Sequence, residues 1–428
     1  MQYFRIEGGY PLNGTIKPTG NKNAGLPLLA AALLTDASIT LDNLPNIGDV
    51  RTKIALLEYM GVDVDFADGR CTLNASGVRN IQPEQPAFGL CSHIRTSVLL
   101  AAPLLARFGE ARIGRPGGDR IGRRRLDTHL AALKAFGVTI DVESDHFYLR
   151  TQRLRGCDLF LDEMSVTGTE QAVLAAVLAQ GSSRIGNAAM EPHVQELCMA
   201  LNKMGARIRG IGTHDLEIEG VAALHGCEYR IAADYMEVGS LIALAAATKS
   251  ELRIEDAQPE NHRITQVVFR RLGVNFIREA NDIVVPAQQP LRVQPDFDGS
   301  VPKIDDMPWP GFPPDLISIA VVLATQCQGN ALVHQKMFDR RLVFVDGLID
   351  MGAGIVQCDP HRVLVMGATQ LHAQRLVSPD IRAGMALVIA ALAARGVSEI
   401  HNIVQIDRGY EHLDQRLGQL GARIQRCG

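Results

Sequence analysis

One hydrophobic pattern recurs six times along the chain. Each time, an apolar run with helical spacing ends in an apolar residue and a glycine, and alternating apolar and polar residues follow. A glycine at such a junction is typical of a helix end, where the backbone adopts positive φ before a strand begins. The six glycines lie roughly 70 residues apart: Gly61, Gly137, Gly205, Gly273, Gly352 and Gly421.

A second pattern lies between these glycines: an Ala/Leu-rich helix, a small polar turn and a short strand. It is clearest at residues 28–40, 172–185, 242–254, 319–333 and 385–400. Small side chains allow helices to approach closely, so we expect buried helices with sheets outside them. A chance recurrence of glycine–strand junctions is the alternative, and the near-even spacing argues against it. Six units divide naturally into two domains of three, with a break near residues 220–235.

Composition narrows the class of protein. The 428 residues include 43 Lys and Arg against 47 Asp and Glu, and aromatic residues make up 5%. This balance argues against a general nucleic-acid binder. No apolar run is long enough to span a membrane, and the first residues lack the pattern of a signal peptide. The eight scattered cysteines form no zinc motif. We therefore expect a cytoplasmic protein with reduced thiols, no metal, and no nucleic-acid or membrane partner.

Two segments are suited to binding anions. Residues 19–25 place Lys22 and Asn23 before an apolar helix, where a cation and backbone N–H groups can face an anion. An ordinary helix start is the alternative. Residues 115–129 read RPGGDRIGRRRLDTH, with five arginines and three glycines. Such a loop is suited to close over phosphates. A plain surface loop or an RNA contact is the alternative, and the low basicity disfavours RNA.

Helix starts supply further candidates. Asp315 follows two prolines and precedes an apolar helix, so it is predicted to be an N-cap. Thr167 and Glu170 have the spacing of a capping box, and Ser165 lies where a helix N-terminus can hold a diphosphate. Taken one by one, four further arginines are more typical of surface salt bridges: Arg95, Arg341, Arg382 and Arg408.

Together these segments resemble the enolpyruvyl transferase family. Residues 20–24 resemble its GxKNA loop, 116–129 its PGGCxIGxRPxDLH lid, 309–315 its hPxFPTD segment and 163–168 its KxSVxA segment. The resemblance implies a two-domain inside-out α/β barrel, built from six βαβαββ pseudo-repeats, three per domain. It also implies one domain at 22–232, with a lid loop at about 112–129, and another at 1–21 plus 233–428.

The resemblance is closer to members that use UDP-N-acetylglucosamine than to 5-enolpyruvylshikimate-3-phosphate synthases. It implies transfer of the enolpyruvyl group of phosphoenolpyruvate to the sugar 3-hydroxyl, with release of phosphate and without a cofactor. In that family this is the first committed step of peptidoglycan precursor synthesis. Two alternatives stay open: an enolpyruvyl transferase acting on another sugar nucleotide, and a non-catalytic paralogue that binds sugar nucleotides. Oligomeric state is not predicted.

The resemblance also implies roles for single residues. Asp119 stands where the family usually has the cysteine that acts as general acid and is alkylated by fosfomycin. A carboxylic acid can donate the same proton when a closed, water-poor lid keeps it protonated. Asp315 is the candidate base, and Lys22 completes the catalytic set. Phosphoenolpyruvate is assigned to Lys22, Arg124, Arg341, Arg382 and Arg408. UDP-N-acetylglucosamine is assigned to Asn23, Arg95, Arg124, Asp127, His129, Ser165, Val166, Asp315 and Met337.

Four positions depart from the family pattern on the nucleotide side. Arg125 replaces a proline, Thr128 a leucine, Glu163 a lysine and Tyr235 an arginine. Because these differences surround the expected nucleotide contacts, they bear on the identity of the acceptor more than on the type of reaction.

Overall fold

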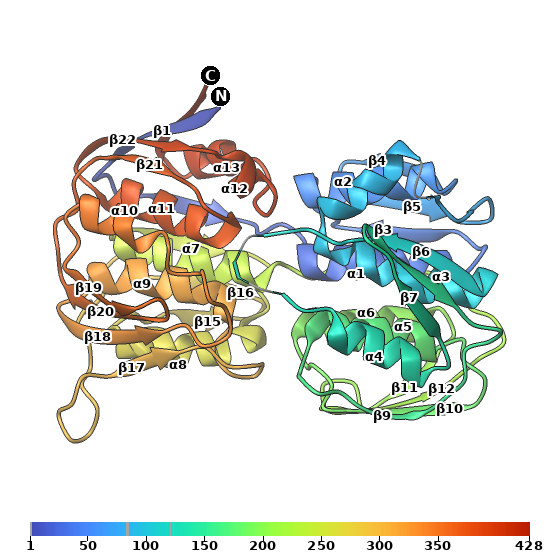
Figure 1. Ribbon diagram of the computed structural model, residues 1–428. Helices are drawn as coiled ribbons and strands as arrows, with labels where there is room; N and C mark the ends of the chain where they lie inside the picture. Colours follow the sequence, from blue (N-terminus) through green and yellow to red (C-terminus); the bar gives the residue numbers. More distant parts are fainter. Residues whose placement is uncertain (1, 83–84, 120, 123) are drawn as a thin grey trace. The chain divides into compact units, whose positions relative to one another are not determined.

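The computed structural model describes residues 2–82, 85–119, 121–122 and 124–428 (Figure 1). The chain folds into two compact units. Among the described residues, unit 1 contains 2–19 and 233–428, together with Ile121 and Gly122, and unit 2 contains 20–82, 85–119 and 124–232. Within unit 1, the Arg340 N–H donates to the Ile121 carbonyl at 3.1 Å. Arg120 and Arg123, which belong to the predicted lid loop, lie outside the described residues.

The six repeat glycines have φ between 76° and 97°. Each follows an outer helix: α2 (Gly48–Tyr59), α4 (Asp127–Ala135), α6 (Pro192–Lys203), α8 (Arg263–Arg271), α10 (Val345–Asp350) and α13 (Leu413–Gln419). Each precedes a strand: β4 (Asp63–Ala67), β7 (Thr139–Val142), β11 (Arg207–Arg209), β15 (Ile277–Glu279), β19 (Ile355–Asp359) and β23 (Arg423–Cys427). Every one of these strands lies at the end of its sheet. The predicted sixfold repeat is confirmed.

Unit 2 carries three sheets in the part of the chain that is described. One has the order β13 (Glu228–Arg230), β3 (Ile39–Asp42), β5 (Arg70–Asn74), β4. The second has the order β11, β12 (Asp215–Glu219), β10 (Ser182–Gly186), β9 (Asp158–Phe160). The third has the order β6 (Glu110–Gly114), β8 (His146–Arg150), β7. In each four-stranded sheet, one strand joins an antiparallel set of three through a parallel pairing. Strand β13 pairs in this way with β3, and β9 with β10.

Unit 1 carries three sheets of four strands in its described residues. They have the orders β15, β16 (Asp282–Val285), β14 (Glu251–Ile254), β2 (Asn13–Ile16), and β17 (Lys303–Asp305), β18 (Gly329–His334), β20 (Arg362–Gly367), β19. The third has the order β21 (Arg375–Val377), β22 (Gly396–His401), β1 (Tyr3–Gly8), β23. Strand β1 therefore pairs with strands from the far end of the chain, as its place beside β22 in Figure 1 shows.

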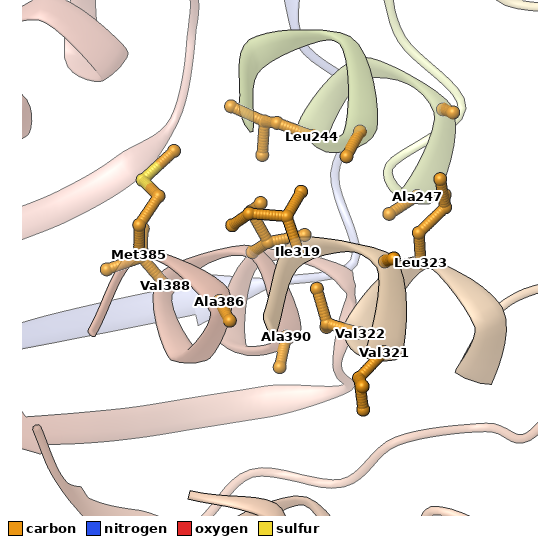
Figure 2. Packing of buried hydrophobic residues seen from close by; sticks show 14 of the residues in the cluster. Leu244, Ala247, Ile319, Val321, Val322, Leu323, Met385, Ala386, Val388 and Ala390 are labelled. Atoms are coloured by element: carbon orange, nitrogen blue, oxygen red, sulfur yellow. The ribbon is translucent and has the colours of Figure 1, made fainter. Parts of the chain in front are cut away.

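Three apolar helices occupy the interior of each unit. Unit 2 has α1 (Lys22–Ala31), α3 (Ala101–Phe108) and α5 (Val166–Ala176), and unit 1 has α7 (Tyr235–Ala247), α9 (Ile317–Thr325) and α11 (Ile381–Ala393). Every residue of α7 and α9 is buried, as expected for helices that are apolar on all sides. Figure 2 shows Leu244, Ile319 and Ala386 from these three helices packed together. The predicted arrangement of helices inside and sheets outside is confirmed.

Close packing also explains a glycine within α11. A Cβ on Gly384 would lie 2.4 Å from Ser378 Oγ and 2.6 Å from Ile406 Cγ1, so alanine there would displace its neighbours. The remaining elements are short: η1 (Ala32–Leu34), η2 (Pro86–Ser92), η3 (Arg95–Leu100), η4 (Pro259–His262), η5 (Pro314–Leu316) and α12 (Val404–Asp407). Among the described residues, no helix combines the length and apolarity needed to cross a membrane.

Candidate active-site residues in each unit

Lys22 begins the first interior helix of unit 2. Asn21 is the N-cap of α1, and its side chain accepts the Asn23 N–H at 2.8 Å. Lys22 is 8% exposed, and its Nζ lies 3.0 Å from Oδ2 of Asp49, in the first turn of α2. A helix N-terminus and an ammonium group in the same place favour an anion. The helix therefore starts at Lys22, and the predicted cation lies in its first turn.

Two arginines of unit 2 lie close to each other. Arg95 begins η3, and its guanidinium donates to the backbone carbonyls of Arg124, at 3.1 Å, and Arg125. Burial, together with the nearby charge of Arg124, lowers the pKa of Arg95 to about 10. Gly118, at φ 109°, leaves room here, because a Cβ would lie 3.2 Å from Arg95 Cβ and 3.6 Å from Arg124 Nη1. Two neighbouring cations repel, and a bound anion removes that repulsion.

The rest of the predicted lid carries one acidic candidate on each side of the arginines. Asp119 is half-buried in the segment between β6 and α4. Asp127 lies exposed in the first turn of α4, where its Oδ2 accepts from Arg125 Nε at 2.8 Å. Thr128 donates from its hydroxyl to Asp162 Oδ1 at 2.7 Å. Two of the four departures from the family pattern, Arg125 and Thr128, thus make polar contacts with neighbouring aspartates.

His129 and Ser165 lie at the start of α4 and of α5. Burial, followed by the charges of Arg95 and Arg124, lowers the pKa of His129 to about 3, so its ring is neutral near pH 7. His129 Nε2 lies 2.7 Å from the Thr167 hydroxyl. Ser165 is the N-cap of α5, and its hydroxyl accepts the Gly168 N–H at 3.2 Å. Val166 follows it in the first turn, half-buried.

The predicted capping box of Thr167 and Glu170 is wrong. Helix α5 begins at Val166, one residue before Thr167, so Thr167 is inside the helix and its hydroxyl contacts His129. Glu170 is 1% exposed, so its carboxyl group lies inside unit 2 and not at the helix end. The spacing of a capping box was present, but Ser165 takes the capping position.

In unit 1, Asp315 lies between two guanidinium groups. Arg341 Nη2 donates to its Oδ1, and Arg382 Nε donates to its Oδ2 at 3.0 Å. The predicted N-cap role of Asp315 is wrong. Asp315 lies within η5. The residue at the N-cap position of α9 is Leu316, which makes no side-chain capping hydrogen bond. The apolar helix thus starts without a side-chain cap, and the Asp315 carboxylate accepts instead from two cations of distant segments.

Three further residues fix Arg341 and Arg382. Asp380 is the N-cap of α11 and accepts the Arg382 N–H at 2.9 Å and Arg341 Nη1 at 3.2 Å. Arg382 Nη1 donates to the Tyr410 hydroxyl at 3.1 Å, and its Nη2 lies 3.9 Å from Asp234 Oδ2. Burial alone would lower the pKa of Arg382, but Tyr410, Asp234 and Asp315 outweigh burial and raise it. Arg382 therefore stays charged.

The other predicted residues of unit 1 make separate contacts. Arg408 follows α12, and its Nη1 donates to Gln405 Oε1 at 2.9 Å. Met337 has an exposed side chain, while its N–H donates to Asp306 Oδ2 at 3.1 Å. Tyr235 begins α7, with its ring centroid 5.7 Å from that of Trp309. The structure thus groups Asp315 with Arg341 and Arg382 in unit 1, and Arg95 with Arg124 in unit 2.

Comparison with known proteins places these residues in a family. The model of the family EPSP synthase (3-phosphoshikimate 1-carboxyvinyltransferase) matches residues 6–417. The chain belongs to this family of enolpyruvyl transferases. Relatives named UDP-N-acetylglucosamine 1-carboxyvinyltransferase include those of Treponema denticola, 50% identical over 99% of both chains, and Bradyrhizobium diazoefficiens, 50% identical over 100% of this chain and 98% of that one.

Solved structures share the enolpyruvyl transferase fold. The enolpyruvyl transferase NikO from Streptomyces tendae has a TM-score of 0.86 at 22% identity, covering 100% of this chain and 99% of its own. EPSP synthase from Acinetobacter baumannii has a TM-score of 0.77 at 16% identity, covering both chains fully. The expected two-domain inside-out barrel is confirmed by these neighbours.

Sequence reasoning missed several residues that support the candidates. Asp380 was predictable, because it stands directly before an apolar helix that carries Arg382. Asp49 was predictable in a similar way, because it is an acidic residue in the first turn of α2. Asp234 and Tyr410 carried no sign of their partner, since Arg382 lies far from both in sequence. The described residues contain no group of three or more His, Cys, Asp or Glu placed to hold a metal ion.

Proposed function

We propose that this protein transfers the enolpyruvyl group of phosphoenolpyruvate to the 3-hydroxyl of UDP-N-acetylglucosamine and releases phosphate. The observation that carries the proposal is 50% identity, over essentially the whole chain, to relatives named UDP-N-acetylglucosamine 1-carboxyvinyltransferase. The cationic groups described above support it. The reaction serves peptidoglycan precursor synthesis, and because phosphoenolpyruvate is a cytoplasmic metabolite, we place it in the cytoplasm.

Phosphoenolpyruvate carries a phosphate and a carboxylate, and the chain has cations suited to both. Lys22, Arg124 and Arg408 are proposed to hold the phosphate, and Arg341 and Arg382 the carboxylate side. Guanidinium groups bind both kinds of anion through two parallel hydrogen bonds. The neighbouring charges of Arg95 and Arg124 support an anion in unit 2, since burial and, after it, the charge of Arg124 lower the pKa of Arg95.

The sugar nucleotide is assigned to a second set of residues, which shares Arg124 with the phosphoenolpyruvate set. Ser165 and Val166 lie at the N-terminus of α5, where N–H groups favour a phosphate. The full proposed set is Asn23, Arg95, Arg124, Asp127, His129, Ser165, Val166, Asp315 and Met337.

The proposed reaction needs one acid and one base. Asp119 donates a proton to the methylene carbon of phosphoenolpyruvate, while Asp315 takes the proton from the sugar hydroxyl. The hydroxyl oxygen bonds to C2 and forms a tetrahedral adduct. The bond from C2 to the phosphate oxygen then breaks, Asp315 passes its proton to the departing phosphate, and the methyl group returns a proton to the Asp119 carboxylate, which leaves the enolpyruvyl ether and free phosphate. The surrounding cations stabilise the charge that develops. No cofactor takes part in this proposal.

The test is phosphate release by the purified protein. We expect release that requires both phosphoenolpyruvate and UDP-N-acetylglucosamine, with a new enolpyruvyl ether seen by mass spectrometry. UDP-N-acetylgalactosamine and UDP-glucose are matched controls that change one sugar substituent each. Binding of UDP-N-acetylglucosamine without any phosphate release would contradict the proposal and favour a non-catalytic paralogue.

A second acceptor is favoured by one observation. Arg125, which replaces the usual family proline, lies with its Nε 2.8 Å from Oδ2 of Asp127, a residue proposed to contact the sugar nucleotide. If this pair sets the acceptor, another sugar nucleotide will have the higher kcat/KM. The variant Arg125→Pro, which carries the usual family residue, should then shift kcat/KM toward UDP-N-acetylglucosamine.

A further inference from the structure

A lysine lies entirely inside unit 2. Lys53 has no exposed surface, although it belongs to α2, an outer helix. It stands one helical turn after Asp49, and residues four apart lie on the same helix face. Asp49 contacts Lys22. One face of α2 therefore carries the carboxylate that holds Lys22 and, one turn later, a buried ammonium group.

The contacts of Lys53 lead to a proposed substrate residue. Lys53 Nζ donates to the backbone carbonyl of Thr96 at 2.8 Å. Thr96 follows Arg95 in η3, and the Arg95 guanidinium donates to the Arg124 carbonyl. A continuous chain of bonds thus runs from α2 through η3 to the backbone that carries Arg124.

The surroundings of Lys53 make its charge costly. Burial lowers the pKa of Lys53 to about 7, and the nearby Cys91 and Glu170 oppose that change. Burial also raises the pKa of Glu170, a residue of α5 with 1% exposure. In the described part of the chain, Oε1 of Glu170 has no hydrogen-bond partner. An apolar side chain at position 53 would avoid the desolvation penalty. Buried polar groups that break local rules are concentrated at functional sites.

We propose that Lys53 is a positioning residue, which fixes η3 through the Thr96 carbonyl and so holds Arg95 and the Arg124 backbone in place relative to Lys22 for substrate binding. The identity of the substrates rests on the proposed function. The proposed effect of Lys53 on the position of Arg95 depends only on contacts within unit 2, and not on the identity of the substrates.

The test compares Lys53→Met, Lys53→Gln and Arg51→Met. Lys53→Met removes the donor and the charge, whereas Lys53→Gln keeps an N–H donor. Arg51→Met is the matched control, because it removes an exposed cation from the same helix. We expect Lys53→Met to raise KM and the dissociation constant for UDP-N-acetylglucosamine about tenfold, the effect of losing one charged hydrogen bond, with a smaller change in kcat. Lys53→Gln should recover part of the loss.

Hydrogen exchange supplies a readout that does not depend on turnover. In Lys53→Met, amides of residues 124–129 should exchange faster, while those of α6 and of unit 1 stay unchanged. Unaltered substrate binding and unaltered exchange in a folded Lys53→Met protein would overturn the proposal. If that variant fails to fold, the same measurements on Lys53→Gln decide. A wild-type protein that releases no phosphate contradicts the proposed function, but the exchange measurement still tests Lys53.

Discussion

Two candidate arginines of unit 1 and two of unit 2 are held in opposite ways. In unit 1, Arg341 and Arg382 donate to the carboxylate of Asp315, and both are nearly buried. In unit 2, Arg95 donates to backbone carbonyls and lies near the like charge of Arg124. Carboxylates contact both members of the first pair, whereas burial and, after it, the charge of Arg124 lower the pKa of Arg95, an effect that Glu163 opposes.

This difference predicts that substitutions of these residues affect folding stability in one unit and ligand binding in the other. Removing a partner from the balanced group of unit 1 leaves a buried charge without compensation, which destabilises the fold. Removing one cation from the pair in unit 2 relieves repulsion and takes away a proposed anion contact. The same kind of substitution should therefore damage folding and activity in unit 1, but mainly binding in unit 2.

The largest effect is expected for Asp315→Asn. The change removes the proposed base and leaves Arg341 and Arg382 without its negative charge, so kcat should fall by about a thousandfold or more. The free energy of unfolding should fall by roughly 3 kcal/mol. Steady-state kinetics and denaturant unfolding measure the two effects. Asp305→Asn, which removes an acidic group that pairs with Lys303 and Lys336, is the control. An active, equally stable Asp315→Asn protein would remove Asp315 from both roles.

Asp119→Asn tests the proposed acid, which lies in unit 2. An amide cannot donate the proton that the methylene carbon requires, so turnover should fall by about a hundredfold or more. UDP-N-acetylglucosamine binding, measured by calorimetry, should stay within about threefold, because the side chain keeps its size. Stability should change little, in contrast with Asp315→Asn. Turnover near that of the wild type would exclude Asp119 as the general acid.

The elements that were predicted correctly follow from patterns among residues that are close together in the sequence. A glycine at each helix end is required by positive φ, and alternation marks the strand that follows, so the sixfold repeat was visible. The caps assigned to Asp315 and Thr167 failed because the helices start at other residues, and the side-chain partners of Asp315 and Thr167 are distant in sequence. Arg382 lies 67 residues from Asp315, and His129 lies 38 residues from Thr167. Lys53 did carry a signal, since it falls in the apolar stripe of Val50, Ile54 and Leu57.

Arg95→Gln and Arg382→Gln form a matched pair across the two units. Arg95→Gln should weaken UDP-N-acetylglucosamine binding at least about tenfold. Its free energy of unfolding should change by less than about 1 kcal/mol, because lost hydrogen bonds are offset by relief from Arg124. Arg382→Gln should cost about 3 kcal/mol, since Asp315 and Asp234 lose their cation. Equal losses of stability in calorimetric unfolding would contradict the distinction between the units.

The stability that Lys53 contributes should depend on pH. Its pKa is about 7 in the folded chain against an ordinary value of 10.5, so between these limits the unfolded chain binds more protons. The free energy of unfolding of the wild type should therefore rise with pH relative to Lys53→Met, by at most about 1.4 kcal/mol per unit. Denaturant unfolding at about pH 6.5 and about pH 8.5 measures the difference. Arg51→Met should follow the wild type, and parallel curves for Lys53→Met would refute the shift.

The smallest expected effect is that of fosfomycin on unit 2. The drug alkylates a cysteine at the lid position of the family, and this chain has Asp119 there, so we expect neither a mass adduct in unit 2 nor time-dependent loss of activity. We expect none of the thiols of unit 2 to take over that role. Burial raises the pKa of Cys71 and of Cys198 to about 12, and it also raises the pKa of Cys91, Cys157 and Cys227. A thiol with a raised pKa forms little of the reactive thiolate. Asp119→Cys should restore labelling at position 119, and an adduct on the wild-type unit 2, mapped by peptide mass spectrometry, would contradict this account.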